Sequence, residues 1–187
     1  WIDGLLASLG VAQATLVGHS QGVLVALETA SRHPDRVAAL TLIAGAMAIP
    51  VNDALIEMSQ SAPEKAFRMM TSWGHGPGAH KFDNTQPGHA FLGYGRRVMA
   101  QNDGAALHAD LVACNSYDGG KDAAASVTQP SLCLLAGKDK MTPVKFGRKM
   151  AEQISDAQCH VFERAGHFLP AEFPIEVNDA MAAFLSH

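Results

Sequence analysis

Short apolar runs recur along the chain and alternate with segments in which apolar residues return at helical spacing. Four of these runs have the length of a strand, and they are apolar throughout instead of alternating with polar residues. We therefore predict buried strands at 14–19, 37–44, 132–136 and 159–162. Buried strands that alternate with helices are typical of an α/β domain, in which helices cover both faces of a parallel sheet.

Two helices are predicted in the N-terminal part of the chain. Apolar residues recur at helical spacing from Trp1 to Leu9, and Gly10 is placed to end that helix. A second amphipathic pattern begins near Val23 and stops before Pro34, because the residue before a proline avoids helical geometry.

Two more helices are predicted near the C-terminus. The first has Thr142 as its N-cap and Pro143 at its first helical position, and its apolar face is formed by Phe146, Met150 and Ile154. The second begins near Pro174 and is expected to bury four residues, which are Val177, Ala180, Met181 and Phe184.

The second and third strands are separated by far more residues than a crossover helix requires. Between Ala44 and Ser131 lie 86 residues with helical patterns of their own, and structureless loops of that length are uncommon in compact domains. We predict a helical lid over 47–126, inserted between the core segments 1–46 and 127–187. The part from Trp73 to Gly93 is rich in Gly, Pro and His and is expected to be irregular.

The predicted lid holds five of the eight methionines, which are Met47, Met58, Met69, Met70 and Met99. Two interpretations stay open: these side chains pack the lid helices together, or they form a pliable apolar wall over a substrate pocket. For the second case the candidate pocket residues are His19, Met69, Met70, Trp73 and Phe168.

Composition excludes several classes of protein. The chain is 48% hydrophobic and 17% charged, unlike a disordered segment, and a net charge of -4 argues against nucleic acid as a partner. No apolar run approaches the ~20 residues of a membrane span. Cys133 and Cys159 lie in apolar runs and, with Cys114, are interpreted as free thiols, the first two buried. Free thiols and the absence of a leader pattern indicate a reducing compartment, the cytoplasm.

A strong motif for chemistry is the sequence Gly18-His19-Ser20-Gln21-Gly22. It lies between a predicted buried strand and an amphipathic helix, which is the context of a nucleophile elbow. Such a turn presents the serine in strained backbone geometry at the carboxyl edge of the sheet. The flanking glycines are expected because side chains there would clash with the neighbouring backbone.

A serine hydroxyl becomes a nucleophile when a base removes its proton and an acid orients that base. The loop after the strand at 132–136 contains Asp139, and the loop after the strand at 159–162 contains His167. The order Ser20, Asp139, His167 places all three residues at the carboxyl ends of parallel strands, where open α/β sheets bind ligands. We therefore predict that His167 approaches both Ser20 and Asp139.

Other residues compete for these roles less well. Asp53 and Asp118 are alternative acids, but both fall in the predicted lid, and the loop after the second strand contains no acid. His75, His80 and His89 match no metal-ligand spacing, so we predict no metal site. His19 adjoins the nucleophile and is interpreted as a packing residue.

The motifs G-H-S-Q-G, G-K-D-K-M-T-P and A-G-H-F resemble the nucleophile, acid and histidine motifs of the α/β-hydrolase family. The segment Arg32–Val37 resembles that family's link from the elbow helix to the next strand. The resemblance covers 1–46 and 127–187. Compared with that family, the chain lacks upstream strands and a loop that gives one oxyanion donor. We therefore expect four parallel strands in the spatial order of the sequence, with 14–19 at an exposed edge, where self-association is possible.

These observations predict a cofactor-free serine hydrolase that acts on carboxylic esters of small apolar substrates through an acyl-enzyme. The backbone N–H of Gln21 is one expected oxyanion donor. The resemblance also leaves other reactions open, namely hydrolysis of amides, lactones or carbon–carbon bonds and cofactor-free peroxidation. A hydrolase-like binding protein without catalysis, or an inactive fragment, is the alternative of a different class.

Overall fold

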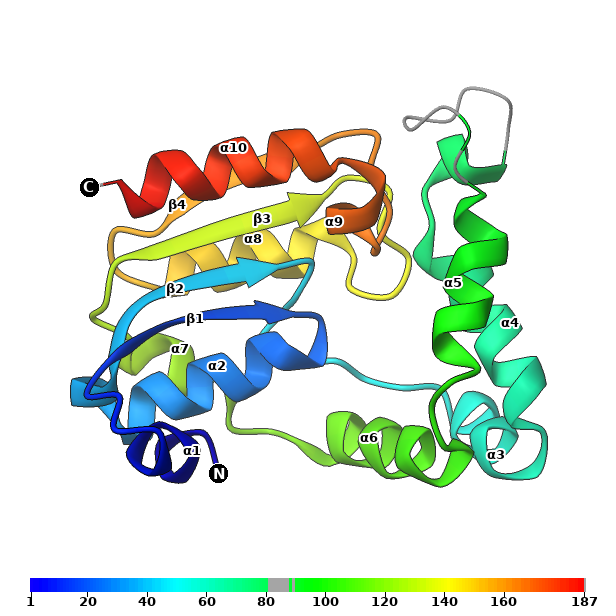
Figure 1. Ribbon diagram of the computed structural model, residues 1–187, viewed down its shortest axis with the longest axis horizontal. Coiled ribbons are helices and arrows are strands. Elements are labelled where there is room, and N and C mark those ends of the chain that lie inside the picture. Colours follow the sequence, from blue (N-terminus) through cyan, green and yellow to red (C-terminus); the bar gives the residue numbers. More distant parts are fainter. Residues whose placement is uncertain (81–87, 89, 187) are drawn as a thin grey trace.

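The computed structural model describes residues 1–80, 88 and 90–186. Its centre is a sheet of four parallel strands, β1 (Ala14–His19), β2 (Val37–Ile43), β3 (Ser131–Ala136) and β4 (Gln158–Phe162). Their spatial order β1-β2-β3-β4 follows the sequence, as predicted (Figure 1). All four carboxyl ends therefore meet at one edge of the sheet.

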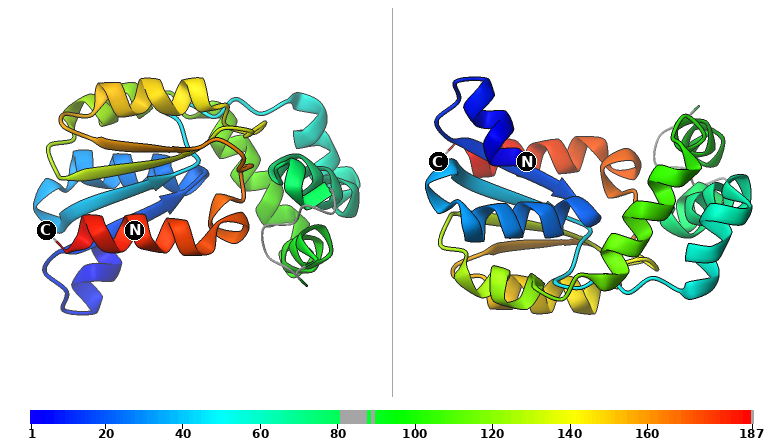
Figure 2. Two further views of the ribbon diagram at one scale, coloured as in Figure 1. Left: turned by 90° about the horizontal axis from the view of Figure 1, so that it is seen from above. Right: turned by 90° about the horizontal axis from the view of Figure 1, so that it is seen from below.

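Helices cover both faces of the sheet, which confirms the predicted α/β architecture (Figure 2). One core cluster joins the strands to α2 (Gln21–Arg32), α7 (Gly120–Ser126) and α8 (Val144–Gln153). A second cluster on the other face joins them to α9 (Leu169–Glu172) and α10 (Pro174–Leu185). Smaller elements are α1 (Ile2–Ser8) and the 3₁₀ turns Pro34–Arg36 and Pro77–His80.

The edge strands are more exposed than their apolar sequences predict. Within the described chain β1 pairs with β2 alone, and Val17 on it is 52% exposed. Cys159 on β4 is exposed, so the prediction of a buried thiol there is wrong, whereas Cys133 on the interior strand β3 is buried. A side chain on an edge strand lacks the neighbouring strand and its covering helix, so an apolar sequence alone does not bury it.

The predicted apolar face of α8 is also partly wrong. Met150 and Ile154 are buried, but Phe146 is 42% exposed. The buried side of this helix instead includes Gly147, where an added Cβ would come within 2.6 Å of Leu135. Residues three apart share a helical face, so the contact line through Gly147 and Met150 turns Phe146 toward water.

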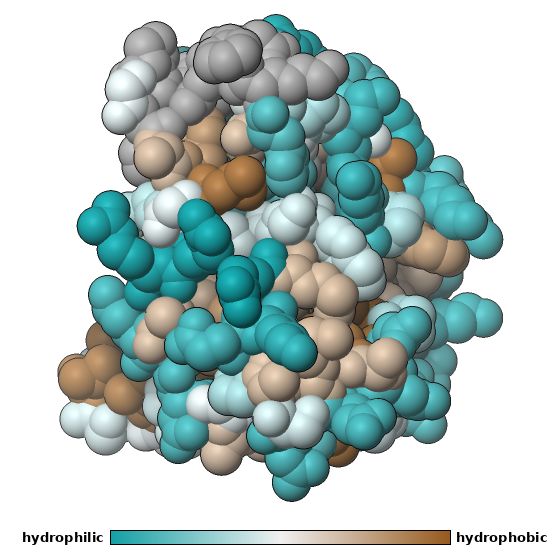
Figure 3. All heavy atoms as spheres, turned by 90° about the vertical axis from the view of Figure 1, so that its right-hand side faces the viewer, coloured by the Kyte–Doolittle hydropathy of each residue, from teal (hydrophilic) through white to brown (hydrophobic). Residues whose placement is uncertain are grey.

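Between β2 and β3 lies the helical segment, our name for residues 47–126. Its helices α3 (Asp53–Ser61), α4 (Pro63–Gly74), α5 (Phe91–Met99) and α6 (Gly104–Ser116) stand beyond the carboxyl ends of the strands (Figure 1). Seen from that side, hydrophilic side chains surround smaller hydrophobic areas (Figure 3). The last helix of the segment, α7, packs instead against α2 and contributes Ala123 and Ala124 to the main core.

The methionines of the helical segment mostly pack its own helices. Met70 is buried in a cluster with Leu55, Ala66 and Leu111, and three other methionines pack against that cluster, namely Met58, Met69 and Met99. Met47 packs against the main core. Among the described helices, none has the length and apolar character needed to cross a membrane.

Candidate active site

Ser20 occupies a sharp turn between β1 and α2. Its backbone angles, φ 55° and ψ −120°, lie in a region that residues with a side chain rarely adopt. A Cβ on Gly18 would lie 2.3 Å from the carbonyl oxygen of Gly22, so this glycine is required for the turn. The prediction that Gly22 is also required for the turn is wrong, because a Cβ on Gly22 would meet nothing within 4 Å in the described structure.

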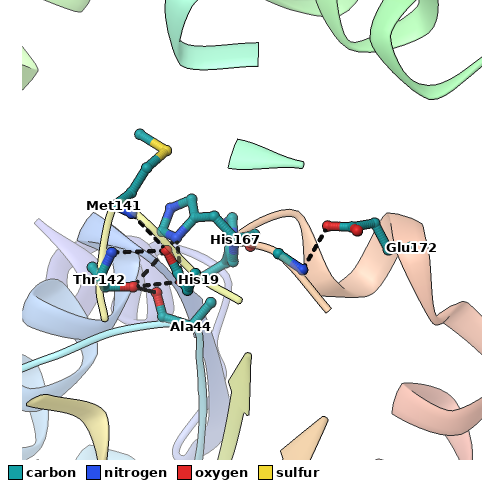
Figure 4. Close-up of polar contacts among 8 residues, drawn as sticks. His19, Ala44, Met141, Thr142, His167 and Glu172 are labelled. Atoms are coloured by element: carbon teal, nitrogen blue, oxygen red, sulfur yellow. Dashed lines mark hydrogen bonds and ion pairs between the residues drawn. The ribbon is translucent and has the colours of Figure 1, made fainter. Parts of the chain in front are cut away.

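His167 and Asp139 meet as predicted. The Nδ1–H of His167 donates to Oδ2 of Asp139 over 2.8 Å, and the two side chains are 3% and 0% exposed (Figure 4). Because Nδ1 carries the donated proton, Nε2 of the neutral ring holds the lone pair that a general base needs. The alternative acids Asp53 and Asp118 are exposed on the helical segment, away from this contact.

The carboxylate of Asp139 is held by its own loop. Its Oδ1 accepts the backbone N–H groups of Met141 and Thr142, each at 2.8 Å. The hydroxyl of Thr142 lies 2.8 Å from Oδ2 and 2.7 Å from the carbonyl oxygen of Ala44 (Figure 4). These contacts fix the rotamer of Asp139 and leave Oδ2 turned toward His167.

The role of Thr142 differs from the one predicted. Helix α8 begins at Val144 with Pro143 as its cap residue, so the prediction that Thr142 is the N-cap is wrong. Its hydroxyl bonds to Asp139 and to the end of β2 instead of to the first turn of the helix. A threonine three residues after a loop aspartate was a usable signal for this contact, since such side chains bond to nearby loop groups.

His19 contacts the proposed base directly. Its Nε2–H donates to the backbone carbonyl of His167 over 2.7 Å, and the two ring centroids lie 4.9 Å apart. Burial lowers the pKa of His19, and the neighbouring His167 lowers it further. The neutral ring of His19 thus joins the end of β1, directly before Ser20, to the histidine loop, our name for residues 163–168 between β4 and α9.

The predicted hydrogen bond between His167 and the Ser20 hydroxyl is not among those of the described residues. Catalytic contacts are often long before a substrate binds and shorten in its presence. The backbone N–H of Gln21 lies in the first turn of α2, where N–H groups have no acceptor within the helix. The Gln21 side chain donates to the carbonyl oxygen of Asp110 on α6 over 3.2 Å.

Two of the candidate pocket residues lie close together, since the ring centroids of His19 and Phe168 are 6.3 Å apart. Phe168 stacks near His75 with centroids 4.7 Å apart, while Trp73 is 42% exposed and Met70 is buried among the helices of its segment. A cavity of about 460 Å³ lies between α1, α2 and α6. Of the predicted site residues, Gln21 lines it.

The loop histidines have separate partners. His75 is buried and its Nδ1–H donates to the carbonyl oxygen of Thr71, while His80 contacts the carbonyl oxygen of Ser72. His89 lies outside the described residues. In the described ranges, no three His, Cys, Asp or Glu side chains are grouped to hold a metal ion.

Sequence reasoning missed Glu172, which is 3% exposed beside the histidine loop. Burial raises its pKa to about 7, the charge of Asp139 adds to the rise, and hydrogen bonds from two backbone N–H groups oppose it. A single acidic residue within the apolar stretch 168–174 was the available signal, because an acid in such a stretch is expected to have a specific partner.

Comparisons with known proteins show the family and the fold of the chain. The model of the alpha/beta hydrolase family matches residues 1–180. A 2-hydroxymuconate semialdehyde hydrolase of Pseudomonas sp. (strain CF600) is 26% identical over 209 aligned positions, covering 100% of this chain and 68% of that protein. A pimeloyl-(acyl-carrier protein) methyl ester esterase of Neisseria meningitidis serogroup B (strain ATCC BAA-335 / MC58) is 28% identical over 179 positions, covering 88% and 66%.

Among solved structures, the enol-lactonase from Burkholderia xenovorans LB400 superposes with a TM-score of 0.89 at 21% identity. That superposition covers 100% of this chain and 70% of the lactonase chain. The chain spans about two thirds of the length of the curated relatives it matches. With a family match over nearly its whole length and the same fold in solved members, the chain belongs to the α/β-hydrolase family.

Proposed function

We propose that the chain carries the catalytic centre of a serine hydrolase that acts on carboxylic esters of small apolar substrates. The observation that carries the proposal is the buried contact between His167 and Asp139 at the sheet edge where Ser20 occupies its strained turn. The contact fixes the ring in the tautomer that can accept a proton. A place for this contact near the serine is supported by His19, the residue before Ser20, which bonds to the carbonyl oxygen of His167.

In the proposed reaction the Ser20 oxygen attacks the ester carbonyl while its proton passes to Nε2 of His167. The resulting tetrahedral oxyanion collapses, the bond to the leaving alcohol breaks, and His167 returns the proton to that alcohol. Water then attacks the acyl-enzyme, again with His167 as base, and the acid is released with Ser20 restored. Throughout, Asp139 orients His167 and stabilises its charged form.

The oxyanion needs donors where the negative charge develops. We infer that the N–H of Gln21 is one of them, because it follows the nucleophile at the start of α2 and the helix dipole is positive there. A donor of this kind contributes about 2.7–4 kcal/mol to the transition state. We assign the role of a lid to the helical segment, since it stands beyond the strand ends that carry the three residues (Figure 1).

We infer that the bond hydrolysed is an ester. Ester hydrolysis is supported by the esterases among the relatives and structural neighbours, including a thermophilic esterase at 26% identity. The semialdehyde hydrolase and the enol-lactonase among them keep carbon–carbon and lactone hydrolysis as second candidates. Attack on a carbonyl carbon generates an oxyanion in each of these reactions, so we expect the residues proposed here to serve any of them.

The test is turnover of p-nitrophenyl acetate and butyrate by the natural full-length protein. Ser20→Ala should abolish turnover, whereas Ser61→Ala, an exposed serine on α3, should leave it unchanged. A fluorophosphonate should modify Ser20, as seen by mass spectrometry of the labelled peptide. Labelling of Ser20 together with turnover of a lactone or a vinylogous diketone but not of esters would replace the ester assignment, and no labelling would favour a binding protein.

A further inference from the structure

One buried carboxylate joins the histidine loop to the helical segment. Oε1 of Glu172 accepts the backbone N–H of Gly166 over 3.1 Å, and Oε2 accepts the backbone N–H of Gly76 over 2.9 Å. Gly166 directly precedes His167, and Gly76 follows α4 of the helical segment. Glu172 therefore bridges two backbone segments that are far apart in the sequence. Figure 4 shows Glu172 close to His167, the proposed base.

The two segments are in close backbone contact. A Cβ on Gly76 would lie 2.7 Å from the nitrogen of Gly166, and a Cβ on Gly166 would lie 2.1 Å from the nitrogen of Gly76. On the other side of His167, the N–H of Phe168 donates to the carbonyl oxygen of Gly74 over 2.9 Å. The backbone N–H groups of Gly166 and Phe168, on either side of the histidine, are thus both tied to residues 74–76, the first by way of Glu172.

The geometry calls for a carboxylate and not for an amide. Two N–H donors reach one side chain, and only an ionised carboxylate offers two acceptor oxygens without a donor of its own. A glutamine would satisfy one N–H and turn its NH₂ group toward the other, which leaves a buried donor unpaired at a cost. Burial of an acid beside Asp139 is itself unfavourable, so the residue needs these contacts to be retained there.

We propose that Glu172 is a positioning residue. It sets the place of His167 by holding the backbone N–H of the preceding residue, Gly166, and it couples that place to residues 74–76 of the helical segment. The inference rests on the proposed function, in which His167 is the base. Glu172 does not touch the reacting atoms. Glu172 acts on the position of His167 through the backbone of Gly166. His19 holds the carbonyl group of His167, and Asp139 holds its ring.

Glu172→Gln is the main variant, and Glu176→Gln on the exposed side of α10 is the matched control. In the full-length protein we expect E172Q to lower kcat and the rate of fluorophosphonate labelling of Ser20 about ten- to a hundredfold, with KM nearly unchanged. The upper end corresponds to a base displaced by about 1 Å, and smaller shifts cost less. Hydrogen exchange should rise in peptides that contain 74–76 and 165–168, and E176Q should match the wild type in every measurement.

Gly76→Ala provides a second variant in case E172Q does not fold. It keeps Glu172 but places a Cβ against Gly166, so we expect the same loss of kcat and labelling without a matching change in KM. Wild-type kcat and labelling in whichever of the two variants folds would overturn the role of Glu172. That result differs from failure of the proposed function, in which wild-type protein is not labelled at Ser20 and S20A keeps its turnover.

Discussion

Asp139→Asn tests whether the carboxylate sets the tautomer of His167. Oδ1 of Asp139 accepts two backbone N–H groups, from Met141 and Thr142. An asparagine at this position keeps its amide oxygen on those two donors, because an NH₂ group facing them would lose both bonds. Its nitrogen therefore replaces Oδ2 and presents a donor to Nδ1 of His167, where the wild type has an acceptor.

With a donor opposite it, Nδ1 becomes the acceptor and the ring carries its proton on Nε2. That atom then cannot take the proton of Ser20. The same exchange in a serine-protease triad lowers kcat about 10⁴-fold, which is about 5.4 kcal/mol of transition-state stabilisation at 1.36 kcal/mol per tenfold. The cost in unfolding free energy should be only about 1–2 kcal/mol, because one charge-assisted bond becomes a neutral bond while shape is conserved.

The assay compares kcat for a p-nitrophenyl ester and the labelling rate of Ser20 in the full-length protein, with Asp53→Asn as an exposed control on α3. The tautomer itself is read from the ¹⁵N shifts of His167, which should place the proton on Nδ1 in the wild type and on Nε2 in D139N. If D139N is folded and labels within about threefold of the wild-type rate, the tautomer argument is wrong.

Four further predictions concern stability, thiols, pH and association. The hydroxyl of Thr41 is buried without a hydrogen-bond partner in the described structure, so Thr41→Val should raise the unfolding free energy by about 1 kcal/mol, whereas Thr142→Val, which loses bonded contacts, should lower it. Cys159 should react with Ellman's reagent in the native chain and the other thiols only after unfolding, because it alone among the three is exposed. The pKa of Glu172 rises from 4.5 to about 7 on folding, so the folded state binds the extra proton and the stability of the wild type relative to E172Q should fall as the pH rises through that interval in denaturant titrations. The exposed strand β1 should promote self-association of the 187-residue chain, and Val17→Lys should shift its sedimentation toward the monomer, while unchanged sedimentation would exclude this edge as the contact.

The order of the sheet could be predicted because each strand is a local pattern. An apolar run of five or six residues is visible without knowing its neighbours, and parallel strands joined by helices favour a simple order. Exposure could not be predicted in the same way. Cys133 and Cys159 both lie in runs of strand length, with Gln158 and His160 beside the second, and their difference in burial also follows from which strand has two neighbours.

The three proposed catalytic residues were predictable for a related reason. Ser20, Asp139 and His167 each follow a strand, and the carboxyl ends of parallel strands must meet at one edge. The residues that hold them left local signals in the sequence, but their distant partners were not predictable, because these contacts span about half of the chain. Thr142 reaches the end of β2 98 residues earlier, and Glu172 reaches Gly76 96 residues earlier. The spacing of residues along the sequence does not indicate that two residues so far apart are in contact.

Three contacts hold the histidine loop, two from the sheet edge and one from the helical segment. Asp139 holds the ring of His167 and His19 holds its carbonyl, and both belong to the sheet edge. The third support reaches the loop through residues 74–76 of the helical segment, by way of Glu172. If the helical segment selects the substrate, those of its side chains that do not contact this loop can change without moving the base. Changes at the backbone of 74–76 act differently, since the N–H groups of Gly166 and Phe168 on either side of His167 are tied to it. Specificity and rate are therefore expected to respond to separate parts of the same segment.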